Sequence, residues 1–260
     1  MEIGLPTRKM PPLAIVTLTT DFGTRDGYVG AMKGVVLSRA PDAQIVDITH
    51  EIPRHDVAAG AYALATALPL FRRGTIHVAV VDPGVGGDRR EVICAVGGQF
   101  VVAPDNGLLD LLALGPMQAY AIENDEFRRS SVSMTFHGRD VFAAAAGALA
   151  TGLPPAKAGP EVTLGGHLEG DLLSPSIVHV DVFGNLISNL RCEPFAGGAG
   201  VVIIAGREVP VGRTYGDVEI GALVAYCGSA NTVEIAAREG SAAEVLGVSL
   251  GESIELKASS

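Results

Sequence analysis

The segment Ile76–Arg89 constrains the fold of this chain most. Its first part, Ile76–Val81, is apolar apart from His77 and stops abruptly at an acid, Asp82. A proline and three glycines follow, and then two arginines, of which Arg89 is the first. Short apolar runs are typical of buried strands, whereas proline and glycine impose tight turns. The segment therefore predicts a buried strand with Asp82 at its tip and Arg89 able to fold back toward it.

A carboxylate and a guanidinium on a glycine-rich loop suit polar chemistry, because loops on a rigid scaffold carry many binding and catalytic residues. The competing interpretation of Asp82 and Arg89 is a surface ion pair on a tight turn. Local sequence does not favour one over the other.

Apolar strands and helical spacings alternate over the first part of the chain, which predicts an α/β domain over residues 13–155 with a largely parallel sheet. Besides Ile76–Asp82, the expected strands are Leu13–Thr19, Ala43–Ile48 and a hairpin of Val92–Val96 with Phe100–Ala103. The expected helices are Tyr28–Val36, Val57–Leu68, Asn106–Leu114 and Asp140–Thr151.

The pattern changes after the last of these helices. Residues 152–166 are rich in proline and glycine and predict a linker. Short β-rich runs separated by turn residues then predict a second domain over residues 170–258, a compact β-barrel or sandwich with a short helix at 240–246. A cleft between two such domains is a common ligand site.

Composition excludes several classes of partner. The net charge of −10 and the absence of tryptophan argue against a nucleic-acid-binding protein, which needs a basic face and stacking side chains. No apolar stretch reaches the roughly 18 residues of a membrane span. The polar segment Met1–Pro12 has no apolar run behind it and predicts a short tail rather than a signal peptide.

The chain has three cysteines, Cys94, Cys192 and Cys227, which lie far apart in the sequence and in or beside apolar stretches. This placement predicts buried reduced thiols and a cytoplasmic protein.

Four other loops carry polar side chains at the ends of expected elements. Asp21 follows a strand and can accept hydrogen bonds from a ribose diol or cap a helix. His137 precedes a helix and suits a general base, although a lone histidine is more often structural. Asn185, in a hairpin turn, could read an adenine edge. The segment His50–Asp56 contains possible metal ligands, but Pro53 prevents helical pairing of them, so no metal is expected.

Six motifs occur in the order typical of one family. They are Thr19–Gly23, Asp47–Pro53, Val81–Gly86, Pro104–Leu109, Phe136–Asp140 and Asp181–Asn185. With these motifs the chain resembles the S-adenosyl-L-methionine hydroxide adenosyltransferases, relatives of fluorinase and chlorinase, from about Ile15 to Leu250.

The resemblance implies an α/β domain followed by a β-barrel, a homotrimer with sites between subunits, and hydrolysis of S-adenosyl-L-methionine to adenosine and L-methionine without metal or cofactor. It assigns the catalytic roles to Asp82, Arg89 and His137. It assigns ribose binding to Asp21, adenine binding to Asn185 and contacts with the methionine end to Asp181 and Ser229. The remaining expected substrate-binding residues are Phe22, Asn106, Phe183 and Glu234.

The sequence departs from the halogenases at three places. Asp82 stands where they carry a tyrosine, His137-Gly138 replaces a Tyr-Ser pair whose serine contacts halide, and Ala230 replaces an arginine. Two alternatives to a hydrolase remain. One is a halogenase, and the other is a non-catalytic protein that binds a nucleoside or S-adenosyl-L-methionine.

Overall fold

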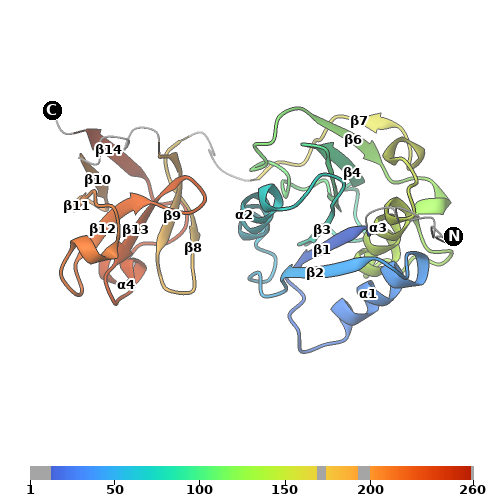
Figure 1. Cartoon of the computed structure of the whole chain (residues 1–260), viewed down its shortest axis with the longest axis horizontal. Helices are drawn as coiled ribbons and strands as arrows, with labels where there is room; N and C mark the ends of the chain where they lie inside the picture. Colours follow the sequence, from blue (N-terminus) through green and yellow to red (C-terminus); the bar gives the residue numbers. More distant parts are fainter. Residues whose placement is uncertain (1–12, 169–173, 193–199, 259–260) are drawn as a thin grey trace, which may run out of the picture. The chain divides into compact units, whose positions relative to one another are not determined.

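The computed structural model describes residues 13–168, 174–192 and 200–258. The expected tail, Met1–Pro12, lies outside these residues. The chain divides into two compact units, residues 1–167 and residues 168–260, and each unit is described by itself (Figure 1).

The first unit is built on a seven-stranded sheet with the strand order β2-β1-β3-β5-β4-β6-β7. Strands β2, β1, β3 and β5 are parallel to one another, and the pairings from β5 to β7 are antiparallel. The α/β class is thereby confirmed. The strands are β1 (Ile15–Thr20), β2 (Gln44–Thr49), β3 (Ile76–Val80), β4 (Glu91–Val96), β5 (Gln99–Pro104), β6 (Met117–Ala121) and β7 (Glu161–Val162).

Helices cover both faces of this sheet (Figure 1). Alternate residues of β3 and its extension point to opposite faces, so Val78 and Val80 join one core while Ala79 and Val81 join the other. The first core includes residues of α1 (Tyr28–Arg39) and α3 (Ala143–Ala150), and the second includes residues of α2 (Val57–Ala67). Short helical turns lie at Leu68–Leu70, Asp125–Phe127, Gly138–Phe142 and Pro155–Lys157.

The carboxyl ends of the parallel strands meet at one edge of the sheet. Thr20 at the end of β1 is paired with Val80 at the end of β3. Asp21, Asp82 and Asn106, which follow β1, β3 and β5, therefore leave the sheet along the same edge. This is the edge at which open α/β sheets bind ligands.

Two expectations for the first unit are wrong. Residues 106–114 form turns instead of a helix, and Gly107 there has a φ of +100°, a left-handed conformation that a helix does not contain. Residues 152–166 are not a free linker, because they add β7 to the sheet edge. Buried Asp105 also accepts hydrogen bonds from the backbone N–H groups of Gly165 and Gly166 at 3.0–3.1 Å.

In the second unit the described strands form two antiparallel sheets. One has four strands in the order β12-β13-β9-β8 and the other has three in the order β11-β10-β14. Two isolated β-bridges connect these sheets, one between Ser176 and Ser253 and one between Val211 and Ala225. The described strands therefore form two sheets around one apolar core, which agrees with the sandwich of the two expected arrangements, and the described residues do not show a closed barrel. The elements are β8 (Ile177–Val180), β9 (Leu186–Arg191), β10 (Gly200–Ile204), β11 (Arg207–Pro210), β12 (Leu223–Cys227), β13 (Thr232–Ala237), α4 (Ala242–Leu246), β14 (Ile254–Ala258) and a helical turn at Tyr215–Asp217.

The expectation of three reduced thiols is also wrong. Cys192, which follows β9, forms a disulfide with Cys227 at the end of β12. Sequence spacing did not indicate this pair, because 35 residues separate the two cysteines and only the packing of β9 and β12 around β13 brings them together. Cys94 is a free, buried thiol, and burial raises its pKa to about 11.

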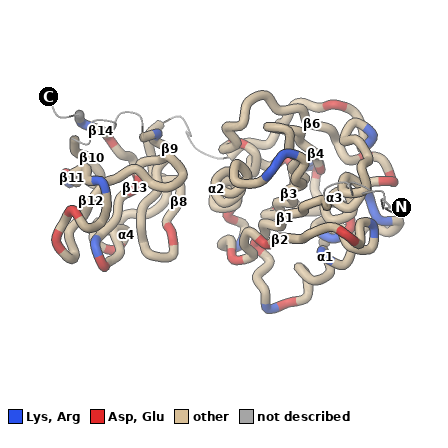
Figure 2. The backbone as a smooth tube through the Cα atoms, in the orientation of Figure 1, with Lys and Arg blue, Asp and Glu red and all other residues tan. Residues whose placement is uncertain are grey.

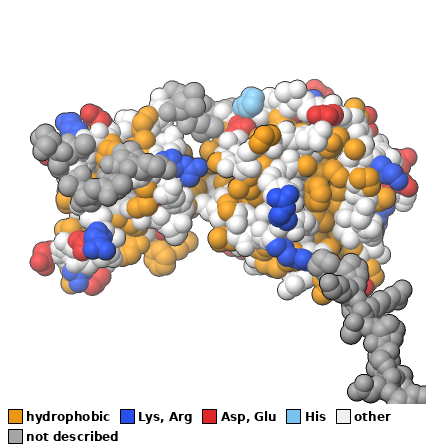
Figure 3. Space-filling model, turned by 45° about the horizontal axis from the view of Figure 1, so that its top comes forward, with side chains coloured by type: hydrophobic (Ala, Val, Ile, Leu, Met, Phe, Trp, Pro, Cys, Tyr) orange, Lys and Arg blue, Asp and Glu red, His pale blue; other side chains and the backbone are white. Residues whose placement is uncertain are grey.

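Charged side chains are mixed over the surface. Lys and Arg alternate with Asp and Glu along both units (Figure 2), and the face shown in Figure 3 carries basic side chains as separate spots rather than as a band. No helix in the described ranges is long and apolar enough to cross a membrane.

Reduction of the Cys192–Cys227 disulfide is expected to lower the free energy of unfolding of the second unit by about 2–4 kcal/mol, because the cross-link restricts the unfolded chain. Urea unfolding followed by circular dichroism, with and without dithiothreitol, measures this difference. A variant with both cysteines replaced by serine should match the reduced protein and ignore the reductant. Equal stability of the oxidised and reduced wild type would contradict the prediction.

Candidate functional site

Asp82 and Arg89 form a nearly buried ion pair at the tip of β3. The Arg89 Nε donates to both carboxylate oxygens of Asp82 at 2.9 and 3.1 Å, and Nη2 donates to Oδ2 as well. The side chains are only 5% and 9% exposed, which excludes the interpretation as a surface ion pair. Burial alone would lower the pKa of the Arg89 guanidinium, but the carboxylates of Asp82 and Glu91 raise it above its usual value.

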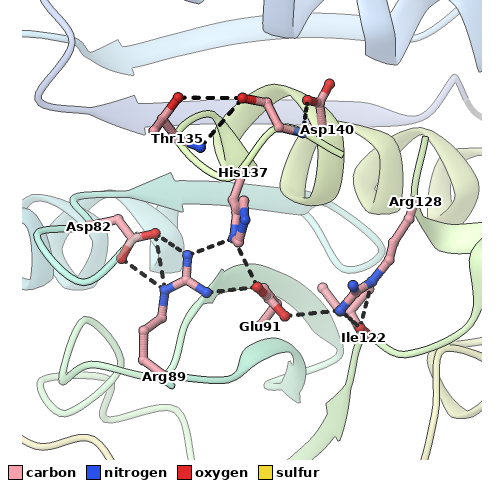
Figure 4. A network of polar contacts seen from close by, with 9 residues as sticks. Asp82, Arg89, Glu91, Ile122, Arg128, Thr135, His137 and Asp140 are labelled. Carbon is pink, nitrogen blue, oxygen red and sulfur yellow. Dashed lines mark hydrogen bonds and ion pairs between the residues drawn. The ribbon is translucent and has the colours of Figure 1, made fainter. Parts of the chain in front are cut away.

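His137 belongs to the same network (Figure 4). Its Nδ1 lies 3.0 Å from Nη2 of Arg89 and 2.9 Å from Oε1 of Glu91. Glu91 also accepts hydrogen bonds from Arg89 Nη1 at 2.7 Å and from Arg128 Nη2 at 3.0 Å. The three predicted catalytic residues, Asp82, Arg89 and His137, are therefore brought together, although 55 positions of sequence separate the first from the last.

Glu91 was not singled out from the sequence. It is the first residue of β4, whose remaining residues are apolar, and it lies two residues after Arg89. In extended chain, residues two apart share a face, so an acid at this position was a signal for a contact near Arg89. The partnership with His137 had no such signal, because 46 positions separate the two residues.

A buried carboxylate anchors the loop that carries His137. Asp140 is fully buried and accepts hydrogen bonds from Arg129 and Arg139 at 2.7–2.8 Å and from the backbone N–H of Ser133 at 2.9 Å. Burial alone would raise the pKa of Asp140, but these donors, Arg139 foremost, hold it well below its usual range. Asp140 therefore acts as a charged anchor within the loop.

Close packing fixes where this loop lies. A Cβ on Gly138 would come within 3.1 Å of the ring of Phe22 and within 3.5 Å of the Met32 sulfur. The ring of Phe22 also makes edge contacts with Tyr28 and Phe136, each at a centroid distance of 6.0 Å. The residues after β1 and the turn after His137 thus pack directly on each other.

Asp21 lies beside an open groove of about 540 Å³, lined by residues 21–26 and 50–54. One of its carboxylate oxygens, Oδ2, accepts a hydrogen bond from the backbone N–H of His55 at 2.9 Å. This contact orients the carboxylate and leaves Oδ1 without a hydrogen-bond partner among the described residues. Asn106 lies at the same sheet edge, where its side-chain amide donates to the backbone oxygen of Val81 at 2.8 Å and so supports the strand end next to Asp82.

The remaining predicted residues lie in the second unit. Asp181 closes the β8–β9 hairpin by accepting from the backbone N–H groups of Phe183 and Asn185, each at 2.9 Å, and from the Asn185 side-chain amide at 2.9 Å. Phe183 and Asn185 line a cavity of about 460 Å³, which Tyr215 and Gly240 also line. Phe183 is 73% exposed.

Glu234 lies near this hairpin. It accepts a hydrogen bond from the hydroxyl of Tyr226 at 2.9 Å. Burial raises the pKa of Glu234 and the charge of Asp181 raises it further, against the opposing hydrogen bond from Tyr226. A Cβ on Gly228 would overlap the Glu234 carboxylate, so this side chain lies directly beside the turn that contains exposed Ser229.

The first unit therefore gathers Asp21, Phe22, Asp82, Arg89, Asn106 and His137 at the end of its parallel strands, and the second unit gathers Asp181, Phe183, Asn185, Ser229 and Glu234 around its hairpin. A search of the described residues for three or more His, Cys, Asp or Glu side chains able to hold a metal finds no such group.

Comparison with known proteins bears on what these residues do. Models of the N-terminal and C-terminal domains of SAM hydroxide adenosyltransferases match residues 16–159 and 175–255. The chain is 43% identical to an (R)-S-adenosyl-L-methionine hydrolase of Thermus thermophilus, over 93% of this chain and 98% of the relative. It is 27% identical to a fluorinase of Nocardia brasiliensis, over 94% and 96% of the two chains. A crystal structure of an uncharacterized conserved protein from Thermotoga maritima is similar, with a TM-score of 0.85, 34% identity and coverage of 93% and 99%.

Asp140→Asn is expected to lower the free energy of unfolding at pH 7 by about 1.5–3 kcal/mol, because a neutral amide replaces the buried carboxylate to which the partly exposed Arg129 and Arg139 donate. The folded pKa of Asp140 is depressed, so its stabilising effect is present above the unfolded value near 4 and is lost as the pH falls through the folded value. Denaturant unfolding should therefore show a smaller difference between wild type and variant at pH 3 than at pH 7. Asp42→Asn, at an exposed turn, is the control; an equal difference at both pH values would contradict the prediction.

Proposed function

The chain belongs to the SAM hydroxide adenosyltransferase family, and on that basis we propose that it hydrolyses S-adenosyl-L-methionine to adenosine and L-methionine. The oxygen of water forms a bond to the ribose C5′, the bond from C5′ to the sulfonium breaks, and its electron pair goes to the sulfur of methionine. The observation that supports this assignment most is the buried contact of Asp82, Arg89 and His137 at the end of β3.

In this proposal the three residues act on the attacking water. Asp82 and His137 orient it and assist its deprotonation, while Arg89 holds the Asp82 carboxylate in position through the bidentate contact. Alignment of nucleophile and sulfonium carbon supplies several kcal/mol through effective concentration. General-base assistance contributes roughly 10²- to 10⁴-fold.

The substrate-binding roles follow the two groups of residues. The free side of the Asp21 carboxylate accepts from the ribose hydroxyls, and Phe22 and Asn106 shape the same edge of the first unit. Asn185 and Phe183 bind the adenine, and Asp181, Ser229 and Glu234 bind the methionine end. Two carboxylates there suit the cationic ammonium group of the substrate.

The assembly and compartment are part of the same proposal. The enzyme is a homotrimer with sites shared between subunits, it needs neither a metal nor a cofactor, and it acts in the cytoplasm on a small-molecule substrate. Analytical ultracentrifugation tests the trimer. The Cys192–Cys227 disulfide is the observation that opposes a cytoplasmic location, because such bonds are rare in reducing compartments.

A halogenase reaction is the second candidate, because fluorinases are relatives. The site opposes it in two ways. A carboxylate at 4 Å repels a halide by roughly 4 kcal/mol at an effective dielectric constant near 20. In addition, a Cβ at Gly138 would lie 3.1 Å from the Phe22 ring, so a serine at this position, where the halogenases contact halide, requires that ring to shift.

Incubation with S-adenosyl-L-methionine in ¹⁸O-water, followed by mass spectrometry, tests the proposed reaction. Label in the 5′-hydroxyl of adenosine is expected, because the attacking oxygen comes from solvent. A 5′-halo nucleoside formed in the presence of chloride would support the halogenase, and calorimetric binding without any product would support a non-catalytic protein.

Asp82→Ala is expected to lower kcat for adenosine formation by at least about 10²-fold, because it removes the carboxylate that orients the water and leaves Arg89 without its main partner. Chromatography of the products measures the rate, and calorimetry should still detect substrate binding. Asp42→Ala removes a carboxylate from an exposed turn and serves as the matched control. Wild-type turnover by the Asp82 variant would refute the role assigned to this residue.

A further inference from the structure

The Nδ1 atom of His137 has two polar neighbours that require opposite protonation states. Nη2 of Arg89 is in hydrogen-bond geometry with Nδ1 at 3.0 Å and can only donate, whereas Oε1 of the Glu91 carboxylate lies in ion-pair contact with Nδ1 at 2.9 Å and can only accept. A neutral imidazole satisfies one of them. If Nδ1 carries the proton it donates to Glu91 and leaves the lone pair on Nε2; otherwise it accepts from Arg89 and Nε2 carries the proton.

The charges around His137 favour the first arrangement. Arg89 already donates through Nη2 to Asp82 and through Nη1 to Glu91, so its charge is matched without the imidazole. A lone pair on Nδ1 would instead face the Glu91 carboxylate at hydrogen-bond distance, which is repulsive. A proton on Nδ1 turns this repulsive contact into an attractive one between an N–H group and a carboxylate oxygen 2.9 Å away, and charge-assisted contacts of this kind are stronger than neutral ones.

Glu91 is held where it can serve this purpose. It starts β4, which is hydrogen-bonded to β5 on one side and β6 on the other, so its backbone is fixed by the sheet. Its second oxygen, Oε2, accepts from Arg128, whose Nε donates to the backbone oxygen of Ile122 at 2.9 Å. The Glu91 side chain is 15% exposed. Figure 4 shows Glu91 between the two guanidinium groups and below the imidazole.

We propose that Glu91 is a positioning residue that accepts the hydrogen bond of Nδ1–H of His137 and thereby leaves Nε2 as the base for the attacking water. This inference rests on the proposed function and assigns the proton within it. As the oxygen of water bonds to C5′ and the sulfur leaves with the electron pair of the broken bond, the proton of the water passes to Nε2. Glu91 then stabilises the resulting imidazolium.

The arrangement also separates the role of Asp82 from that of His137. Both oxygens of Asp82 accept from Arg89, and a carboxylate is ordinarily a much weaker base than an imidazole. Asp82 orients the water in this scheme, and His137 takes its proton. Among the described residues, no hydrogen-bond partner of Nε2 is found, so this nitrogen is open to a water molecule.

Glu91→Leu tests the proposal, because leucine removes the acceptor while keeping a side chain of similar size. Long-range ¹H–¹⁵N spectra of protein labelled with ¹⁵N-histidine report which ring nitrogen carries the proton, and His137→Gln identifies the signal. The wild type should show the proton on Nδ1, and Glu91→Leu should show it on Nε2. Kinetically, kcat should fall by about 10²- to 10⁴-fold while KM changes little.

Glu91→Gln removes the negative charge of Glu91 but keeps an acceptor oxygen. It also tests the proposal if the Glu91→Leu variant does not fold. Its amide oxygen can still accept from Nδ1–H, so the proton should stay on Nδ1. Because the neutral amide does not stabilise the imidazolium, kcat should fall, by less than in Glu91→Leu. An unchanged kcat in Glu91→Gln would overturn the proposal.

Two comparisons control for a purely structural role. Glu161 lies in β7, where its carboxylate accepts a hydrogen bond from the Gln118 side chain at 3.0 Å. Glu161→Leu and Glu161→Gln should leave kcat and the His137 signal unchanged. Arg128→Met removes the other partner of Glu91 and should lower stability without moving the proton of His137. If Arg128→Met moved the proton as Glu91→Leu does, or if Glu91→Leu left it on Nδ1, the proposal would be wrong.

The two readouts keep this inference apart from the proposed function. The position of the imidazole proton is measured without substrate and tests the Glu91–His137 contact alone. If the wild type formed no adenosine while its spectra showed the proton on Nδ1, the reaction would be wrong and the contact correct. If the wild type formed adenosine while its spectra showed the proton on Nε2, the proposed reaction would be correct and the proposed Glu91–His137 contact would be wrong.

Discussion

The active edge of this protein depends on one buried guanidinium. Arg89 contacts Asp82, Glu91 and His137, which come from the end of one strand, the start of another and a turn between elements. A buried cation is costly unless anionic groups surround it, and here two carboxylates do so. Arg89 therefore holds both carboxylates close together, and it fixes the geometry within which the imidazole lies.

The surrounding structure keeps this cluster in place by packing and by further charge. The Phe142 ring lies 5.6 Å from the Arg89 guanidinium carbon, and Asp140 holds the loop before His137 through three donors. Gly86, with a φ of +77°, lets the loop after Asp82 approach the backbone of Met134, where a Cβ would come within 2.5 Å of the carbonyl oxygen. The loops that carry the acid and the imidazole are thus packed against each other as well as hydrogen-bonded.

The similarity of this chain to fluorinases, at 27% identity, raises the question of how related chains select different nucleophiles. In this chain the strand tip is acidic, the position after His137 has no side chain, and the imidazole faces a carboxylate. The first and third of these features suit removal of a proton from water, and Gly138 offers no hydroxyl to contact a halide. In the proposed function, the choice of water over halide therefore rests on local groups at the end of β3 rather than on the fold.

Much of this could be predicted from the sequence, because it rests on local patterns. The apolar run that ends at Asp82, the alternation of strands and helices, and the six ordered motifs indicated the α/β unit, the candidate residues and the family. Features that depend on contacts distant in sequence could not be predicted. Residues 106–114 form turns and Cys192 meets Cys227, because tertiary packing overrides local propensity. The pairing of Glu91 with His137 is of the same kind: the sequence determined which groups could react, and only the tertiary structure decided which nitrogen of the imidazole faces the carboxylate.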